Sequence, residues 1–231
     1  MSYHYAWLIL SLILLAVWVV VYLLLKKGDA RWEMLRVSAW TSLLGLTEPL
    51  FVPEYWNPPS LFELAARTGF DLESFIFSFA VGGLVVSLYD YFFSIRHLPV
   101  VHRSGRHRFH LLAVVSAPFT LLIFLIVLPI NPIYSASLAL LVGFFSTWLC
   151  RPDLLNKMAL SGLLFALVYF LSFSLLRLLF PGYVEAVWNL PALSNLFLIG
   201  VPIEELLWAF TFGLYWSSVY EHLTFHKIKI K

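Results

Sequence analysis

The sequence contains a single cysteine, Cys150, and only 12% of its 231 residues are charged. One cysteine excludes a disulfide within the chain and a cluster of thiolates. Soluble domains usually carry about 25% charged residues, so the low charge excludes an ordinary water-facing surface. No basic patch is interleaved with exposed aromatic residues, and nucleic acid is therefore not expected as a partner.

Several catalytic motifs are also missing from the sequence. There is no G-x-G-x-x-G fingerprint, no Walker loop and no H-E-x-x-H. The last apolar run has no lysine for a retinal Schiff base, and no D-x-x-x-D pair could bind an isoprenoid diphosphate. CAAX-processing intramembrane proteases carry E-E-x-x-x-R, but Ala209 stands at the arginine position here. We expect no cofactor and no metal.

Apolar residues are abundant instead, at 61% of the chain. A transmembrane helix needs about 20 predominantly apolar residues. The first apolar run lacks both a basic leader and an A-x-A cleavage site, so we expect it to be retained as a span. The sequence predicts an all-α integral membrane protein of seven transmembrane helices, over residues 4–25, 36–52, 72–94, 109–130, 133–150, 157–180 and 195–222.

Every alternate loop between these spans is basic, which predicts the orientation of the bundle. We expect the N-terminus outside and the C-terminus inside the cytoplasmic membrane. The basic residues are Lys26, Lys27, Arg31 and Arg36 after the first span, Arg96, Arg103, Arg106 and Arg108 after the third, Arg151 and Lys157 after the fifth, and Lys227, Lys229 and Lys231 in the tail.

Two acids and four histidines accompany the basic loops. Asp90 and Glu221 lie at the inner ends of their spans, and we expect them to pair with these loops. The histidines in or beside one loop could bind a metal, but contact with anionic lipid is the favoured interpretation. They are His97, His102, His107 and His110.

Residues 53–70 are predicted to form an outer connection that contains a short helix. Ser60 and Glu63 have the spacing of a capping box, and Gly69 is a candidate for the C-cap.

The chain resembles itself at an offset of about 131 residues, which aligns Glu73 with Glu204 and Asp90 with Glu221. At an offset of 132, Trp56-Asn57 aligns with Trp188-Asn189. We therefore expect a single membrane domain with repeat A over about 4–97, a linking helix over about 108–130 and repeat B over about 133–226. One linking span makes the two three-helix copies parallel in the membrane.

Ionisable residues within a membrane are costly and mark candidate functional sites. Four glutamates are expected in one layer toward the outer face: Glu48, Glu73, Glu204 and Glu205. The alternative is structural, because acids in a first helical turn stabilise the helix dipole and Arg177 could neutralise one of the last two. Aromatic residues beside this layer could bind an apolar substrate or simply pack: Phe75, Phe79, Trp208, Phe210, Phe212 and Trp216.

Pro202-Ile203-Glu204-Glu205 resembles the P-x-E-E motif of the membrane-embedded lycopene cyclases found in actinobacteria, archaea and fungi. Those enzymes also consist of duplicated three-helix units with one motif in each. The equivalent segment in repeat A departs from the pattern and reads Asp71-Leu72-Glu73-Ser74. Only Glu73 matches the motif there.

The resemblance implies a carotenoid cyclase acting on a lycopene-type isoprenoid, without a cofactor. A carboxylic acid would protonate the terminal double bond, a second double bond would close the ring, and a base would remove a proton. Glu204, Glu205, Glu73 and Glu48 are the candidate catalytic residues. Glu204 or Glu73 is expected to be the acid, and the remaining acids are expected to act as base or electrostatic support. The alternatives are a non-enzymatic binder of carotenoid, quinone or lipid, a small carrier, and a sensor or scaffold.

Overall fold

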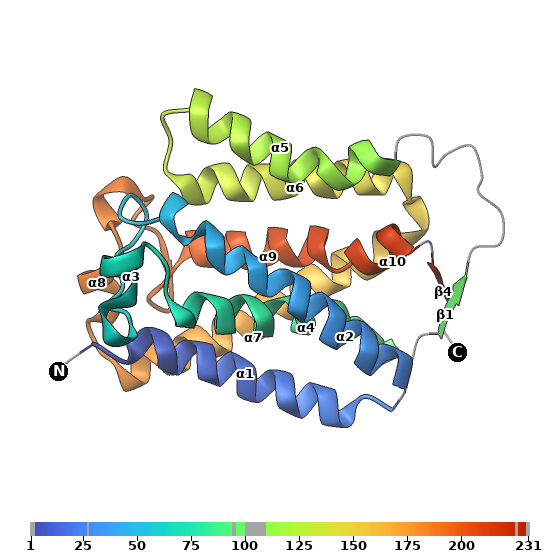
Figure 1. The fold of residues 1–231 in the computed structure, drawn as a ribbon, viewed down its shortest axis with the longest axis horizontal. Coiled ribbons are helices and arrows are strands. Elements are labelled where there is room, and N and C mark those ends of the chain that lie inside the picture. The colour runs from blue at the N-terminus through green and yellow to red at the C-terminus, as the bar shows by residue number, and fades with distance from the viewer. Residues whose placement is uncertain (1–2, 27, 94–95, 100–109, 225, 230–231) are drawn as a thin grey trace.

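The computed structural model describes residues 3–26, 28–93, 96–99, 110–224 and 226–229. The fold is an elongated helical bundle, with the N-terminus at one end and the C-terminus at the other (Figure 1). Within the described residues, five helical segments are long and apolar enough to cross a membrane, which confirms the predicted fold as mainly helical and membrane-compatible. They are α1 (Ala6–Leu24), α4 (Leu72–Phe93), α5 (His110–Val127), α6 (Pro132–Cys150) and Pro152–Leu179.

The last of these segments consists of the 3-10 turn η4 (Pro152–Leu154) and helix α7 (Leu155–Leu179). The predicted spans agree with the five segments to within a few residues. Their apolar runs are long, and flanking charges or prolines end them, so composition alone suffices to predict their bounds.

The predicted span at 36–52 is wrong at its start. Helix α2 begins earlier and covers Gly28–Ser42, and the 3-10 helix η1 continues it over Leu43–Leu50. The early turns are polar, so hydropathy misses them. Arg31 donates to the Leu25 carbonyl at 2.9 Å and thereby stabilises the turn that joins α1 to α2.

The predicted span at 195–222 is also wrong at its start. A short hairpin of β2 (Phe197–Leu198) and β3 (Val201–Pro202) precedes α9 (Ile203–Trp216), and α10 (Val219–Thr224) follows it. Gly200, with φ of +76°, turns the hairpin. An apolar run looks the same in a strand and in a helix, so periodicity could not separate them.

The outer connection at 53–70 contains the predicted short helix, as η2 (Leu61–Glu63) followed by α3 (Leu64–Thr68). Gly69 adopts the left-handed conformation and its N–H bonds to the Ala65 carbonyl at 2.8 Å, as predicted for a C-cap. The capping box does not form. Ser60 Oγ instead accepts from the Ala65 N–H at 2.9 Å, because Glu63 has a positive φ and pairs with Arg67.

A second connection, with α8 (Tyr183–Val187) and the turn η5 (Leu190–Ala192), meets the first at the N-terminal end of the bundle. Trp56 and Trp188 form an antiparallel bridge between the two connections. Asn57 N–H donates to the Val187 carbonyl and Asn189 N–H to the Tyr55 carbonyl, both at 2.9 Å. Residues aligned by the internal similarity thus pair with each other across the two connections.

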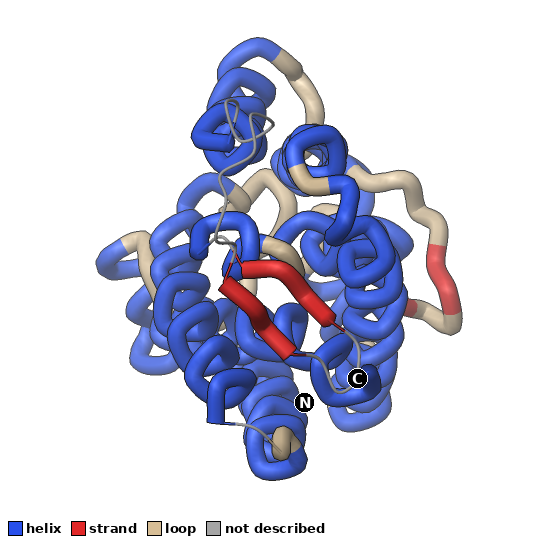
Figure 2. The backbone as a smooth tube through the Cα atoms, turned by 90° about the vertical axis from the view of Figure 1, so that its right-hand side faces the viewer, coloured by secondary structure: helices blue, strands red, loops and turns tan. Residues whose placement is uncertain are grey.

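At the opposite end, β1 (Arg96–Pro99) pairs antiparallel with β4 (His226–Lys229), as Figure 2 shows. Several residues that the predictions for this end concern lie outside the described residues, or their side chains are not described. They concern Lys27, Arg96, His97, His102, Arg103, Arg106, His107, Arg108, Lys227, Lys229 and Lys231.

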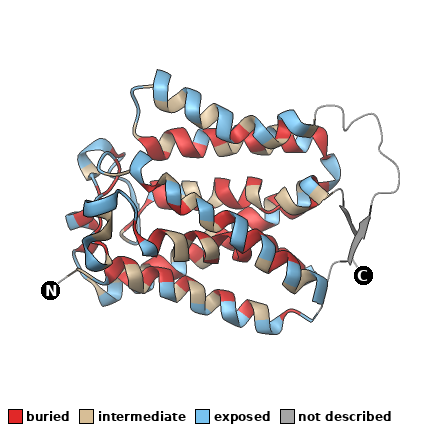
Figure 3. Ribbon diagram, in the orientation of Figure 1, coloured by how far each residue is buried: buried red, intermediate tan, exposed pale blue. Residues whose placement is uncertain are grey.

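The helices pack in two similar groups. Helix α4 packs against α1 and α2, and α9 packs against α6 and α7. Gly213 on α9 lies so close to α7 that a Cβ there would be 2.7 Å from the Gly162 Cα, so the glycine permits close helix contact. Helix α5 packs mainly on α6 and is exposed along most of its length (Figure 3), which suits a lipid-facing helix.

Four buried charged residues meet at the end that carries β1 and β4, which we call the lysine end. Lys157 Nζ lies 3.5 Å from Glu33 Oε1 and 3.4 Å from Asp90 Oδ1, and it also pairs with Glu221. These contacts join α2, α4, α7 and α10. The prediction that Asp90 and Glu221 pair with residues of the basic loops is confirmed for Lys157.

Candidate active site

A cavity of about 590 Å³ lies between α5 and α6 on one side and η1, α4 and α9 on the other. This volume is within the range of small-molecule sites, which are concave and mostly apolar. Val114, Leu121 and Ala136 line it on one side, and Trp208, Phe212 and Trp216 on the other. Its polar lining residues include two of the four predicted glutamates, Glu48 and Glu205.

Glu205 is the most completely hydrogen-bonded acid in the cavity wall. The hydroxyls of Tyr55 and Tyr169 donate to its two carboxylate oxygens, and the Trp188 Nε1–H donates to Oε1 at 2.8 Å. The residue is buried, and no basic residue of the described chain forms an ion pair with it. Three neutral donors therefore stabilise this carboxylate.

The donors come from three separate parts of the fold. Tyr169 projects from α7, whereas Tyr55 and Trp188 lie in the two connections that the Trp56–Trp188 bridge joins. Burial raises the pKa of the Tyr55 hydroxyl well above its usual value, and the neighbouring Glu205 carboxylate raises it further. Tyr55 therefore remains protonated and can only donate to Glu205.

Glu48 lines the same cavity from η1 and has a different environment. Ser74 Oγ donates to its Oε2 at 2.9 Å, while Oε1 has no hydrogen-bond partner among the described residues. Pro49 follows Glu48 inside the 3-10 helix. Ser74 occupies the position that aligns with Glu205, so the altered motif of repeat A supplies a hydroxyl to Glu48 in place of a second acid.

Glu73 and Glu204 do not line the cavity. Glu73 Oε1 accepts from the Leu61 N–H at 2.6 Å, and Glu204 Oε1 accepts from the Ser194 N–H at 2.8 Å and the Tyr134 hydroxyl at 2.6 Å. Both are buried in the first turns of their helices. The aligned pair thus binds the outer connections, and each repeat anchors its preceding loop in a similar way.

Arg177, the candidate partner for Glu204 or Glu205, binds elsewhere. Its Nη1 donates to the Ile199 carbonyl at 2.5 Å, in the turn of the β2–β3 hairpin. Among the described residues Arg177 forms no ion pair with either glutamate. It therefore stabilises the segment that leads into α9 and does not pair with Glu205.

Three of the six predicted aromatic residues line the cavity, and three do not. Trp208, Phe212 and Trp216 line it and stack along one face of α9, with centroid distances of 5.2 Å and 5.5 Å between successive rings. Phe75, Phe79 and Phe210 are not in its lining. Spacing of four residues places side chains on one helical face, and this explains the division on α9.

Tyr55, Ser74, Tyr169 and Trp188 were not predicted from the sequence as site residues. Trp188 carried a usable signal, because the aligned Trp56-Asn57 and Trp188-Asn189 pairs are rarer matches than apolar ones. Tyr169 lies in the middle of a long apolar helix, away from the membrane interfaces where tyrosine is common. Tyr55 and Ser74 carried no comparable signal.

A family model described as lycopene cyclase matches residues 131–223, which include α6, α7, α9 and the P-x-E-E motif. No curated protein and no solved structure matches the chain. The matched region supplies Tyr169, Trp188 and Glu205, together with the aromatic residues of α9, to the cavity. Residues 131–223 are therefore similar to the lycopene cyclase family, over less than half of the chain.

Proposed function

We propose that this protein is a carotenoid cyclase that closes a six-membered ring at the end of a lycopene-type chain. The observation that carries the proposal is the Glu205 carboxylate, which lines an aromatic, largely apolar cavity and is held by three neutral donors. An apolar isoprenoid suits such a cavity. A carboxylate without a cationic partner can interact with a positive charge on the substrate.

The proposed reaction conserves atoms and electrons. A carboxylic acid donates its proton to one carbon of the terminal double bond, which leaves a carbocation on the other carbon. The π electrons of a nearby double bond form the new ring bond and move the positive charge into the ring. A carboxylate then removes a proton from a ring carbon, so that the product is an isomer of the substrate.

We assign the proton donor to Glu48 and the acceptor to Glu205. Ser74 donates to Glu48 Oε2, and among the described residues no side chain is within hydrogen-bonding geometry of Oε1, so this carboxyl can carry a proton toward the cavity. Glu205 receives three hydrogen bonds, and hydrogen bonds to the charged form favour that form. Between turnovers a proton must return from Glu205 to Glu48, and water entering after product release can carry it.

The aromatic column on α9 has a defined part in this proposal. Cations bind the faces of tryptophan and phenylalanine, and the attraction grows when water is absent. Trp208 and Phe212 line the cavity beside Glu205, where the carbocation would form. These residues would stabilise positive charge in the transition state while Glu205 remains available as the base.

We also propose the membrane arrangement of three helices, one linking helix and three helices, with the N-terminus outside. Pairing of the aligned Trp56 and Trp188 supports two parallel copies, because equivalent connections lie at the same end of the bundle only when the copies have the same orientation. The similar packing of α4 and α9 against their neighbours supports it too. The exposed helix α5 would then be the linking span.

Expression in a bacterial host that accumulates lycopene tests the proposed function. We expect chromatography to reveal cyclised pigment with the wild-type protein and a loss of at least about 100-fold with Glu205→Gln, as general acid–base catalysis contributes about 10²–10⁴-fold. Glu63→Gln, at an exposed residue outside the cavity lining, is the matched control. Unchanged lycopene in cells whose membranes contain folded wild-type protein would refute the proposal.

The second candidate is a non-enzymatic carotenoid or lipid binder, favoured by the departure of Asp71-Leu72-Glu73-Ser74 from the motif. In that case lycopene would co-purify with the protein and be recovered unchanged. The same expression experiment separates the two functions. A cyclised product has the same mass as lycopene but a different chromatographic retention time and absorption spectrum, and only a cyclase would produce it.

A further inference from the structure

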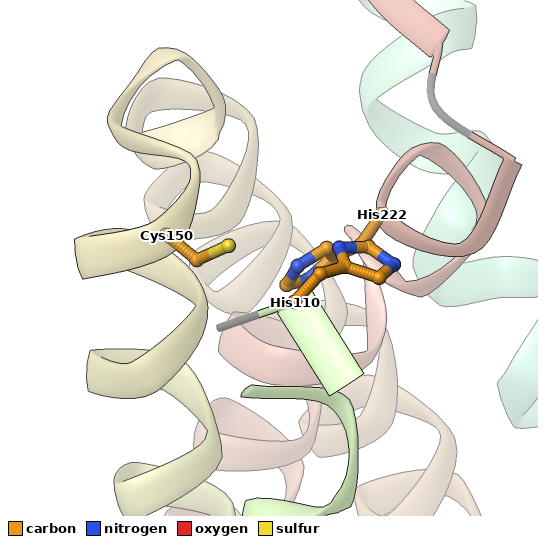
Figure 4. A group of neighbouring side chains, drawn as sticks. All are labelled: His110, Cys150 and His222. Atoms are coloured by element: carbon orange, nitrogen blue, oxygen red, sulfur yellow. The ribbon is translucent and has the colours of Figure 1, made fainter. Parts of the chain in front are cut away.

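Two histidines and the single cysteine converge at the lysine end of the bundle. His110 opens α5, Cys150 closes α6, and His222 lies on α10. Figure 4 shows the Cys150 sulfur directed toward the two imidazoles, which lie next to each other. One ligand atom from each residue lies within 4.8 Å of the others, and the two rings are 4.2 Å apart at their centroids.

We propose that His110, Cys150 and His222 bind a transition-metal ion of the Zn²⁺ type. In tetrahedral zinc sites Zn–S is about 2.3 Å and Zn–N about 2.0–2.1 Å, which places ligand atoms roughly 3.3–3.6 Å apart. The observed spacing of up to 4.8 Å needs only small side-chain movements to reach this geometry. Imidazole and thiolate together select zinc over magnesium or calcium, which prefer oxygen ligands.

The chemistry of binding balances simply. Cys150 loses its thiol proton to solvent as the metal–sulfur bond forms, and both imidazoles bind in their neutral form. Three protein ligands leave a fourth position for water. Neighbouring groups favour a cation here, because Glu221 precedes His222 on α10 and forms part of the network with three carboxylates around Lys157.

The position of the site gives it a consequence for the cavity. Val114 and Val115, about one turn beyond His110, line the cavity from α5, and Val219 and Leu223 line it from α10. Helix α5 packs mainly on α6. A metal bound to residues of α5, α6 and α10 would therefore fix the wall that α5 contributes and hold the cavity closed at this end.

Metal binding by the detergent-purified full chain tests the site. After treatment with a chelator, the protein is titrated with Zn²⁺ in competition with a chromophoric chelator. We expect about one zinc per chain. We expect Cys150→Ser and His222→Ala to weaken binding at least about 100-fold, the upper end of the loss seen for outer-shell partners alone. His4→Ala, at the opposite end of the chain, is the matched control and should bind as the wild type.

Co²⁺ substitution provides a test on the unmutated protein, in case a variant fails to fold. Co²⁺ bound to Cys150 should give a thiolate-to-cobalt charge-transfer band. It should also give ligand-field bands with the intensity of a tetrahedral site. A cobalt complex without that band would refute the site. Zinc binding that survives His222→Ala but is lost on joint substitution of His102 and His107 would also overturn the proposal.

Discussion

The two ends of the bundle both bury acids, but they stabilise them in different ways. At the lysine end, Glu33, Asp90 and Glu221 surround the Lys157 ammonium. At the other end, which we call the glutamate end, Glu48, Glu73, Glu204 and Glu205 accept from hydroxyl, indole or backbone N–H donors. None of these four forms an ion pair with a described residue.

The difference indicates that one end contributes to stability and the other to activity. An ammonium on α7 that binds carboxylates from three other helical elements fixes the four elements together. A carboxylate whose charge is already compensated is a poor base. Carboxylates held by neutral donors keep their negative charge uncompensated and can respond to a cation. We therefore expect substitutions at the lysine end to change stability, and substitutions of cavity-lining acids at the glutamate end to change activity.

The largest effect on stability is expected for Lys157→Met. Removal of one partner from a buried ion pair costs about 3–5 kcal/mol, and here three carboxylates share the ammonium. Thermal unfolding in detergent measures the loss. Arg67→Met is the matched control, because it breaks the exposed Arg67–Glu63 pair, and such pairs contribute about 0–1 kcal/mol. Equal unfolding temperatures for the two variants would show that the lysine network is not structural.

A smaller effect, on activity, is expected from the aromatic column. Phe212→Leu removes a ring that lines the cavity, and Phe210→Leu removes one on the same helix that does not. A cation–π contact contributes about 0.5–2 kcal/mol, so Phe212→Leu should slow cyclisation about 2- to 30-fold in membranes with equal amounts of protein. Phe210→Leu should stay near the wild-type rate. Equal losses in both variants would make the column a packing feature only.

The smallest effect on activity is expected for Glu204→Gln. The glutamine amide oxygen can still accept from the Ser194 N–H and from the Tyr134 hydroxyl, and Glu204 does not line the cavity. The loss should correspond to about 1 kcal/mol or less, the weight of one altered hydrogen bond, hence about 5-fold in rate. An inactive but folded Glu204→Gln protein would transfer the catalytic role from Glu205 to Glu204.

Much of the fold followed from the sequence, because long apolar runs and isolated acids are conspicuous. The acid layer was predictable since an ionisable residue in an apolar run is rare. The choice between Glu204 and Glu205 was not predictable, because adjacent residues on a helix point about 100° apart. Which of them faces the cavity depends on how α9 is rotated by packing against α6 and α7.

The rest of the site depends on contacts between segments distant in sequence. Tyr55 and Trp188 reach Glu205 only because the two outer connections pair with each other. Nothing in either segment alone indicates that pairing, although the aligned tryptophans hinted at equivalence. Likewise, the single cysteine in the sequence excluded a thiolate cluster, but it did not indicate that Cys150 lies beside His110 and His222. That proximity depends on how three helices pack.

Deuterium labelling in D₂O tests the central claim, that a carboxyl proton starts the ring closure, most directly. Membranes containing the wild-type protein are given unlabelled lycopene, and the products are analysed by mass spectrometry. We predict one non-exchangeable deuterium for each ring formed, and neither label nor ring with Glu48→Gln. Cyclised product without deuterium, or full labelling in Glu48→Gln, would contradict the account.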